Sequence, residues 1–401
     1  MGIIERCRIP HLTPTLSAPR GGVGDREPLA VYIHWPFCRS KCPYCDFNSH
    51  VRERIDARGW TEALLGDLDR QAELAPRHEV VSIFFGGGTP SLMPPDTAAA
   101  LIERVKRHWK TAPKLEITLE ANPNSAEAER FAGFADAGVN RLSLGVQSLD
   151  PKALKFLGRG HDRAEAIAAI ELSQKLFQRT SFDLIYARPG QSRAAWRKEL
   201  DEALSLAGEH LSLYQLTIEP GTAFHTRARL GELELPDDEA AAALFEMTQE
   251  RLAAHGLPAY EISNHARPGA ESRHNLAYWR YEDYLGVGPG AHGRITRGGV
   301  KYATRQRRLP EAWLKSPEFE EMTAISRESA VEEMVMMGLR LTEGIPRARL
   351  ETVAACSIEA LFGISLTRLI VGGFVTLGKQ RFAATIAGRQ RLNSVLSALF
   401  G

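Results

Sequence analysis

The chain has 401 residues, of which 44% are hydrophobic and 25% charged, a composition typical of a globular enzyme. Fifty Lys and Arg side chains against 49 Asp and Glu give a formal charge of +1, so no strong overall field attracts nucleic acid or anionic lipid. No apolar run reaches the roughly 20 residues of a membrane span. These features favour a cytoplasmic protein without nucleic acid as a partner and without a membrane span.

The first 28 residues are rich in Pro, Gly and Arg and have no hydrophobic periodicity. They lack the apolar stretch of a secretory signal, and acidic residues and prolines interrupt the basic amphipathic helix of a transit peptide. We expect residues 1–28 to be a disordered extension.

Residues 29–235 alternate short, β-branched and aromatic strands with helical patterns, which predicts an α/β fold with parallel strands. Six such units fall short of the eight of a closed barrel, so a partial (β/α)6 barrel is expected. The predicted strands are 29–35, 80–86, 115–121, 140–146, 181–187 and 210–218, and the predicted helices are 57–75, 95–110, 125–137, 150–177 and 193–207.

The pattern changes after residue 235. An α+β accessory region is expected over 236–305, with a helix at about 237–255 and a short strand near 260–262. Residues 306–401 combine amphipathic helices with a strand pair followed by a helix, which predicts a small winged-helix-like domain. Such modules often bind DNA, but the near-neutral charge does not favour DNA here.

Three of the five cysteines, Cys38, Cys42 and Cys45, crowd the stretch PFCRSKCPYCDFNSH. Three thiols so close together, in an odd total, indicate metal binding in a reducing compartment rather than a disulfide framework. A structural zinc site commonly adds a second C-x-x-C or an H-x₃₋₅-H pair, and neither accompanies this loop. Three thiolates suit a 4Fe–4S cluster with one iron left without a protein ligand. A zinc-bound scaffold without redox chemistry remains an alternative.

The pattern C-x-x-x-C-x-x-C at the end of a first strand resembles the signature of the radical S-adenosylmethionine (SAM) enzymes, whose core is a partial (β/α)6 barrel. The resemblance implies that SAM binds the open iron through its amino and carboxylate groups. It also implies that the reduced cluster cleaves SAM to methionine and a 5′-deoxyadenosyl radical.

Glycine-bearing or polar motifs follow the later strands, at the rim where α/β barrels build their chemistry. They are FFGGGTPSL (84–92), LEANP (119–123), RLSLGVQS (141–148) and FDLIYARPGQ (182–191). Glycines allow close backbone approach to a ligand, Arg suits a carboxylate, and acidic or amide side chains suit ribose hydroxyls. By motif, the residues on SAM-contacting positions are Tyr32, Tyr44, Gly87, Gly88, Thr89, Glu120, Gln147, Arg159 and Asp183.

Ten motifs, from VYIHWPFCRSKCPYCDF to YLGVGPGAHG, resemble in order the oxygen-independent coproporphyrinogen III oxidase (HemN) family and its sister group HemW, over residues 30–401. The decarboxylating HemN enzymes carry a further cysteine two residues after the third ligand, where this chain has Phe47, as HemW proteins do. LYQLTIEPGT and HNLAYW also resemble HemW. One departure is ARPGQ, where the family reads GLPGQ, so Arg188 leaves the packing of that loop open.

The resemblance to HemW implies a heme chaperone that binds a 4Fe–4S cluster and SAM and delivers heme to respiratory apoproteins, without coproporphyrinogen oxidase activity. An oxygen-independent coproporphyrinogen III oxidase is the alternative enzyme. Docking at the membrane through partners, a homodimer, and productive SAM cleavage are left open.

The stretch SRHNLAYWRYEDY is the expected place of heme contact, because a His can ligate iron and aromatic rings offer a flat apolar surface. A lone His among aromatic residues is also often a hydrogen-bonded core residue. His265, His292 and Cys356 are rival ligands. The candidate heme residues are His274, Asn275, Tyr278 and Trp279.

Overall fold

The computed structural model describes residues 26–316 and 319–401. The predicted disordered extension therefore lies almost entirely outside the described residues. Its last two residues belong to the first strand, because β1 begins at Glu27.

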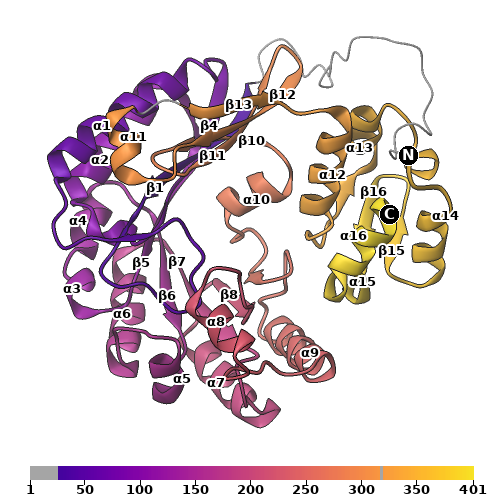
Figure 1. Cartoon of the computed structure of the whole chain (residues 1–401), viewed down its shortest axis with the longest axis horizontal. Helices are drawn as coiled ribbons and strands as arrows, with labels where there is room; N and C mark the ends of the chain where they lie inside the picture. The colour runs from indigo at the N-terminus through magenta and orange to yellow at the C-terminus, as the bar shows by residue number, and fades with distance from the viewer. Residues whose placement is uncertain (1–25, 317–318) are drawn as a thin grey trace.

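Six parallel strands in the order β1-β4-β5-β6-β7-β8, with their crossover helices, form the main body of the chain (Figure 1). This arrangement confirms the predicted partial (β/α)6 fold. Apolar residues alternate with polar ones in β6 (RLSLGVQ) and β8 (HLSLYQ), because the two faces of the sheet have different surroundings. The bounds of the six strands are β1 (Glu27–Trp35), β4 (His78–Gly87), β5 (Lys110–Ala121), β6 (Arg141–Gln147), β7 (Arg179–Tyr186) and β8 (His210–Gln215).

The crossover helices lie outside the curved sheet in Figure 1. Two of the predicted helices are each divided in two. The break after α5 contains Gly158 with φ +65°, and a new helix then starts at the capping box formed by Asp162 and Glu165. The helices are α1 (Ala57–Ala72), α2 (Pro95–His108), α3 (Ser125–Ala128), α4 (Phe131–Asp136), α5 (Pro151–Phe156), α6 (Arg163–Leu176) and α7 (Arg193–Leu206), followed by α8 (Ala223–Arg229) and α9 (Asp238–Ala254).

The accessory strands extend the same sheet at both edges, to eleven strands in the described part of the chain. β10 (Asp283–Val287) pairs in parallel with β1, and the antiparallel β11 (His292–Arg297), β12 (Val300–Gln306) and β13 (Phe319–Ala324) continue outward. At the other edge β9 (Asn264–Ala266) pairs with β8. The predicted strand near 260–262 is wrong by a few residues, because the Glu261 carboxylate turns inward to Asn264 and Arg340.

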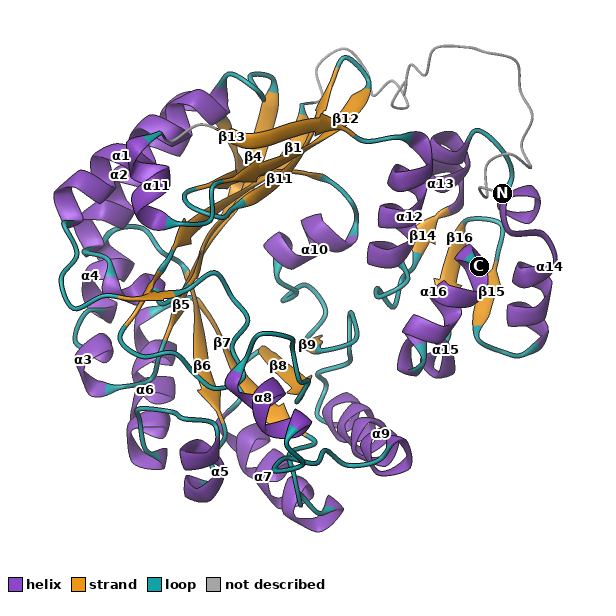
Figure 2. Cartoon of the chain, viewed as in Figure 1, coloured by secondary structure: helices purple, strands orange, loops and turns teal. Residues whose placement is uncertain are grey.

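Helix α10 (Arg273–Trp279) lies in the concave side of the sheet, opposite the outer helices (Figures 1 and 2). A short helix, α11 (Pro310–Lys315), packs on the outside, where the Trp313 ring stacks on Trp60 at 5.7 Å between centroids. Of these two short helices, only α10 therefore lies on the concave side of the partial barrel.

The C-terminal region has a hydrophobic core of its own, separate from that of the barrel. A three-stranded sheet, β14-β16-β15, packs among helices, which agrees with the predicted winged-helix-like arrangement. The elements are α12 (Arg327–Gly338), β14 (Ile345–Pro346), α13 (Arg347–Ala354), α14 (Ile358–Val371), β15 (Val375–Leu377), β16 (Arg381–Ala384), α15 (Ile386–Gln390) and α16 (Leu392–Phe400).

Across the described residues, no single helix has the length and apolar character needed to span a membrane. The bent pair α13 and α14, with 114° between the two helices, passes that test by length and composition alone.

Candidate functional site

The cysteine loop follows β1 at the carboxyl edge of the sheet. Two short parallel strands, β2 (Phe37–Cys38) and β3 (His50–Val51), fasten the two ends of the loop to each other. Inside the loop the Cys45 amide donates to the Cys42 carbonyl at 3.1 Å, which forms a tight turn. All three thiols are half-buried, and they lie at the strand ends where the sequence predicts the site.

Each thiol sulfur has a polar neighbour. Cys38 Sγ accepts a hydrogen bond from the Thr89 hydroxyl at 3.4 Å, and Cys42 Sγ accepts one from Arg159 Nη1 at 3.2 Å. Burial raises the pKa of the Cys38 thiol, and the Thr89 donor opposes this rise. Hydrogen-bond donors and a guanidinium favour the thiolate, which is the form that binds metal.

The arrangement of the sulfurs can be compared with that of a single zinc site. Tetrahedral zinc with Zn–S bonds of about 2.3 Å places its sulfur ligands roughly 3.8 Å apart. The three thiols are not among the groups of described residues whose ligand atoms lie within 4.8 Å of one another. Both ring nitrogens of the nearby His34 are engaged, by the Tyr32 hydroxyl and the Asn48 carbonyl. The donor set therefore fits a multinuclear cluster better than one zinc ion.

The glycine motif lies directly against the cysteine loop. A Cβ on Gly88 would stand 2.6 Å from the Phe37 carbonyl oxygen, and Gly87 has φ +115° beside the His34 ring. The amides of Gly88 and Thr89 donate to Trp35 and Phe37 at 2.8 Å. A side chain at Gly88 would push the motif off the loop, so this glycine is required for the two segments to meet.

Two carboxylates face each other near the ends of β5 and β7. Burial and the nearby Asp183 raise the pKa of Glu120 to about 8, and the Gly87 amide opposes this rise. Burial also raises the pKa of Asp183 to about 6, although Ser212 donates to it. Asp183 Oδ1 is buried without a hydrogen-bond partner among the described residues. Such acceptors suit the hydroxyl groups of a bound ligand.

Arg159 joins the cysteine loop to the ends of β5 and β6. Its Nη1 contacts Cys42 Sγ and, at 3.5 Å, the Tyr44 hydroxyl. Its Nη2 donates to Asn122 Oδ1 at 2.5 Å and to the Gly145 carbonyl at 2.7 Å. The side chain is thus already held by the protein, with Nε buried and unpaired within the described residues.

The remaining predicted SAM residues gather at the same rim. Gln147 ends β6 in the left-handed region, with φ +70°, a backbone strain that is typical of functional sites. The Tyr32 side chain on β1 points into the barrel and contacts His34. The structure thus brings together the three thiols and the nine residues that the motifs indicate.

Two residues of this rim were not predicted. Asn122 contacts Thr89 as well as Arg159, and its place in the quoted motif LEANP is the signal that could have identified it. Asn48 donates to the carbonyls of Pro289 and Arg308, both at 3.0 Å. Its bonds span more than 200 residues of sequence, so no local pattern could reveal them.

The departure at Arg188 is accommodated by a buried ion pair. Arg188 is 6% exposed, and its Nη2 lies 2.5 Å from Glu199 Oε2. The Nη1 group donates to the Ser148 hydroxyl at 2.7 Å. The packing that the sequence left open is therefore a salt bridge behind Gln147, and Ala187 before it adopts φ +57°, where the resembling family has Gly.

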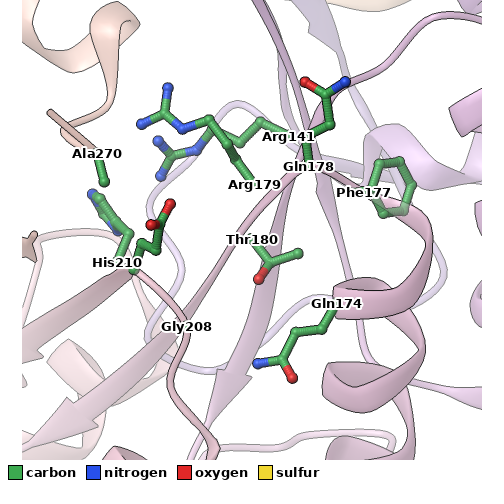
Figure 3. Close-up of a pocket in the computed structure, with 10 residues that line it drawn as sticks. Arg141, Gln174, Phe177, Gln178, Arg179, Thr180, Gly208, His210 and Ala270 are labelled. Carbon is green, nitrogen blue, oxygen red and sulfur yellow. The ribbon is translucent and has the colours of Figure 1, made fainter.

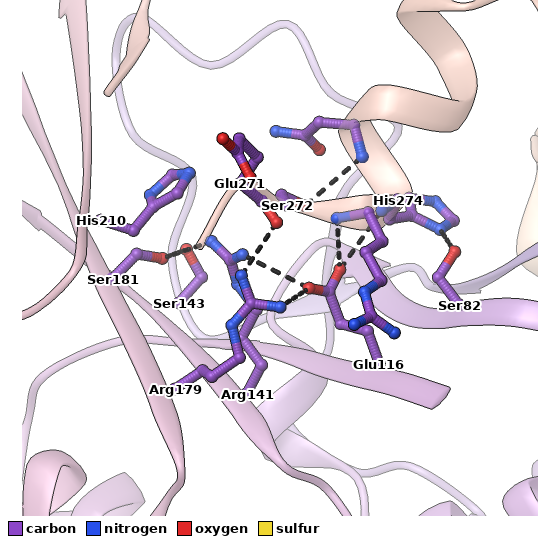
Figure 4. Close-up of polar contacts among 12 residues, drawn as sticks. Ser82, Glu116, Arg141, Ser143, Arg179, Ser181, His210, Glu271, Ser272 and His274 are labelled. Carbon is purple, nitrogen blue, oxygen red and sulfur yellow. Dashed lines mark hydrogen bonds and ion pairs between the residues drawn. The ribbon is translucent and has the colours of Figure 1, made fainter. Parts of the chain in front are cut away.

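The predicted heme element is divided between two environments. His274 is 1% exposed, and one ring nitrogen contacts the Ser82 hydroxyl at 3.0 Å (Figure 4). The other ring nitrogen contacts the Tyr278 hydroxyl at 2.8 Å. Burial lowers the pKa of His274 to about 3, so the ring is neutral. In this conformation His274 is a hydrogen-bonded core residue, and iron ligation would require its Nε2 to leave Tyr278.

Trp279 faces the C-terminal region instead. The Arg340 guanidinium lies 4.5 Å from the centroid of the Trp279 ring. A cavity of about 220 Å³ next to it is bordered by Trp279, Arg280, Arg349 and Arg381, among others. Asn275 lies in the first turn of α10, where its amide is capped by Ser272.

The rival heme ligands lie apart from this element. His265 is buried, with Nε2 3.0 Å from the Gln249 side chain. His292 is exposed at the start of β11, and Cys356 packs beside the C-terminal core.

Comparisons with known proteins identify the family of the chain. Residues 32–203 match the radical SAM superfamily, and residues 325–391 match the HemN C-terminal domain. The heme chaperone HemW of Escherichia coli is 39% identical over 373 residues, which cover 92% of this chain and 97% of that protein. The chain belongs to the HemW family.

Another relative supports this membership, and one solved structure shares the fold. The mitochondrial radical S-adenosyl methionine domain-containing protein 1 of Danio rerio is 37% identical, over 92% of this chain and 86% of that protein. The coproporphyrinogen III oxidase HemN of Escherichia coli, described as a radical SAM enzyme, superposes with a TM-score of 0.76 at 20% identity, over 94% of this chain and 90% of that one. The likeness to HemN concerns the fold.

Proposed function

We propose that this HemW family member is a cytoplasmic heme chaperone that carries a 4Fe–4S cluster and SAM and passes heme to apoproteins of the respiratory chain. The observation that carries the proposal is the 39% identity to the Escherichia coli heme chaperone over 97% of that protein. The three thiols at the carboxyl edge of the barrel support a cluster in the same chain.

In this proposal Cys38, Cys42 and Cys45 hold the cluster, which supplies one-electron chemistry to SAM bound at its open iron. The rim residues around Glu120 and Asp183 hold the SAM nucleoside, and Thr89 and Arg159 donate hydrogen bonds to the sulfurs of Cys38 and Cys42. The unpaired Asp183 Oδ1 is the acceptor that a ribose hydroxyl would satisfy.

The identity of residue 47, a phenylalanine, supports a chaperone over an oxidase. Phe47 is 60% exposed, so packing does not require an aromatic ring beside the thiols. The oxidase resemblance implies a cysteine there. We expect Phe47→Cys to gain no coproporphyrinogen decarboxylation, because the rest of the substrate pocket also differs.

We propose that heme contacts the segment His274–Trp279, with the Trp279 ring as its apolar surface. Arg280 and Arg381 line the neighbouring cavity and both pair with Glu343. A heme propionate would take the place of that carboxylate. Ligation by His274 is the second part of this proposal, and it requires the imidazole to exchange the Tyr278 hydroxyl for iron.

The test is an anaerobic titration of the reconstituted protein with hemin, followed by incubation with coproporphyrinogen III. We expect about one hemin per chain, a 4Fe–4S spectrum that Cys42→Ala abolishes, and unchanged porphyrinogen. Efficient formation of protoporphyrinogen IX would establish the oxidase instead, and a colourless protein with bound zinc would establish the scaffold.

Variants of the heme element complete the test. We expect Trp279→Ala to weaken hemin binding by about tenfold, because an aromatic anchor is lost. His274→Ala should shift the Soret band, whereas His292→Ala, an exposed control, should change neither property.

A further inference from the structure

A second cavity opens at the amino ends of β6, β7 and β8, at the opposite end of the barrel from the thiols (Figure 3). Its volume is about 170 Å³. Arg141, Arg179 and His210 are the first residues of these three adjacent parallel strands, and all three side chains line it. Two guanidinium groups and an imidazole thus meet because neighbouring strands start at the same level.

Arg141 is 3% exposed and incompletely paired. Its Nη2 donates to the Ser181 hydroxyl at 3.2 Å. Its Nε and Nη1 have no hydrogen-bond partner in the part of the chain that the structure describes. Burying a guanidinium with two N–H groups that lack acceptors lowers the stability of the folded state, unless a ligand supplies the acceptor.

The nearest carboxylate cannot fill this need. Glu116 Oε1 accepts from the amides of Arg273 and His274, and Oε2 lies 2.5 Å from Arg179 Nη1 (Figure 4). The distance from Oε2 to Arg141 Nη1 is 3.7 Å, an ion pair without a hydrogen bond. The Glu116 carboxylate is therefore shared between two guanidinium groups and the amino terminus of α10.

The other groups around the cavity leave it receptive to negative charge. His210 Nε2 contacts the Tyr260 hydroxyl at 3.0 Å, and Nδ1 is buried without a partner among the described residues. Glu209 is the one carboxylate on the lining of this cavity, and its side chain is exposed, so solvent weakens its opposition to an anion.

We propose that this cavity binds a small oxyanion, a phosphate or a small carboxylate, between Arg141, Arg179 and His210. The volume is large enough for such an ion but far too small for SAM or heme. Arg179 Nη2 also donates to the Glu271 carbonyl at 2.8 Å, so a bound anion would connect the strand ends to the segment that leads into α10. The site is independent of the proposed heme and SAM chemistry.

Calorimetric titration of the full chain with inorganic phosphate, and separately with citrate, tests this proposal against sodium chloride at matched ionic strength. The two ligands distinguish phosphate from carboxylate as the preferred source of the oxyanion. We expect saturable binding that Arg141→Gln weakens by at least about tenfold, because charge-assisted hydrogen bonds are lost. Arg163→Gln, which removes an exposed arginine paired with Glu202 on the outer helices, is the matched control and should leave binding unchanged.

A second variant, Glu209→Gln, keeps the proposal testable if Arg141→Gln fails to fold. Removing an exposed negative charge at the lining should tighten oxyanion binding by roughly threefold without disturbing the buried ion pairs. Hydrogen exchange at residues 270–279 should slow when the anion binds. Titration heats for phosphate and citrate that do not differ from those for chloride, in both the natural chain and Glu209→Gln, would overturn the proposal.

Discussion

Glu116 and Glu120 lie four residues apart on the same face of β5, yet their surroundings are opposite. Glu116 is 2% exposed, accepts from two helix amides and forms ion pairs with Arg141 and Arg179. Glu120 has no ion pair among the described residues, and burial and Asp183 raise its pKa to about 8. Ion pairs neutralise Glu116 toward the amino end of the barrel, whereas Glu120 and Asp183 toward the carboxyl end are buried near each other.

The difference distinguishes a carboxylate that stabilises the fold, Glu116, from carboxylates that are available to a ligand, Glu120 and Asp183. A buried carboxylate with several partners fixes one arrangement, and removing it leaves other charges unpaired. Two facing carboxylates without a cation cost stability, and they are retained where a ligand uses them. Mutations at the two ends of the barrel should therefore have different consequences.

The largest effect is expected at Glu116. Glu116→Gln removes the anion that serves Arg141 and Arg179, and we expect the free energy of unfolding to fall by about 3–5 kcal/mol. Anaerobic urea denaturation followed by circular dichroism measures this change. Glu62→Gln, in an exposed pair with Arg58, is the control and should cost at most about 0.5 kcal/mol. Equal effects of the two substitutions would remove the distinction between the two ends.

Arg188 offers a second buried pair, at the carboxyl end, with a predicted effect of about 2–4 kcal/mol. Arg188→Leu restores the apolar residue of the resembling family but leaves Glu199 buried without its cation. Adding Glu199→Leu should recover most of the lost stability, since no charge then stays unpaired. A double variant as unstable as the single one would show that the loop depends on the arginine itself, as measured by the same denaturation.

The buried carboxylates Glu120 and Asp183 should make the stability depend on pH. Because the folded pKa of Glu120, about 8, exceeds its usual value, the folded state binds more protons than the unfolded state between about pH 4.5 and 8. Stability without SAM should therefore fall as the pH rises through this range and level off above it. Glu120→Gln should lose less stability than the natural chain between pH 5 and 8. Parallel urea curves at these two pH values measure the difference, and equal losses would contradict the raised pKa.

The sequence predicts the main fold because hydrophobic strands alternate with amphipathic helices, and it locates the site because motifs follow strand ends. Tertiary contacts decide the rest. Asn48 bonds to Pro289 and Arg308, and Glu116 caps a helix more than 150 residues later, so neither role has a local signature. His274 is a further example, since the same HNLAYW letters permit an iron ligand or a core residue. The short strand expected near residue 260 was misplaced because Glu261 has a buried ion pair there.

The smallest predicted effect concerns the hydrogen bond that holds His274. Tyr278→Phe removes the partner of Nε2 and should reduce the free energy of unfolding of the heme-free protein by about 1 kcal/mol. Tyr284→Phe is the control. The ring centroids of Tyr284 and Tyr278 lie 4.5 Å apart, and the Tyr284 hydroxyl makes no hydrogen bond to the described residues.

The same variant decides between the two parts of the heme proposal. If His274 ligates iron, the natural chain must first break the bond to Tyr278, so Tyr278→Phe should tighten hemin binding by about fivefold, the equivalent of about 1 kcal/mol. Hemin titration of Tyr278→Phe and Tyr284→Phe measures this gain. Unchanged affinity would mean that His274 stays in the barrel interior when heme binds, and that the Trp279 side of α10 makes the contact without it.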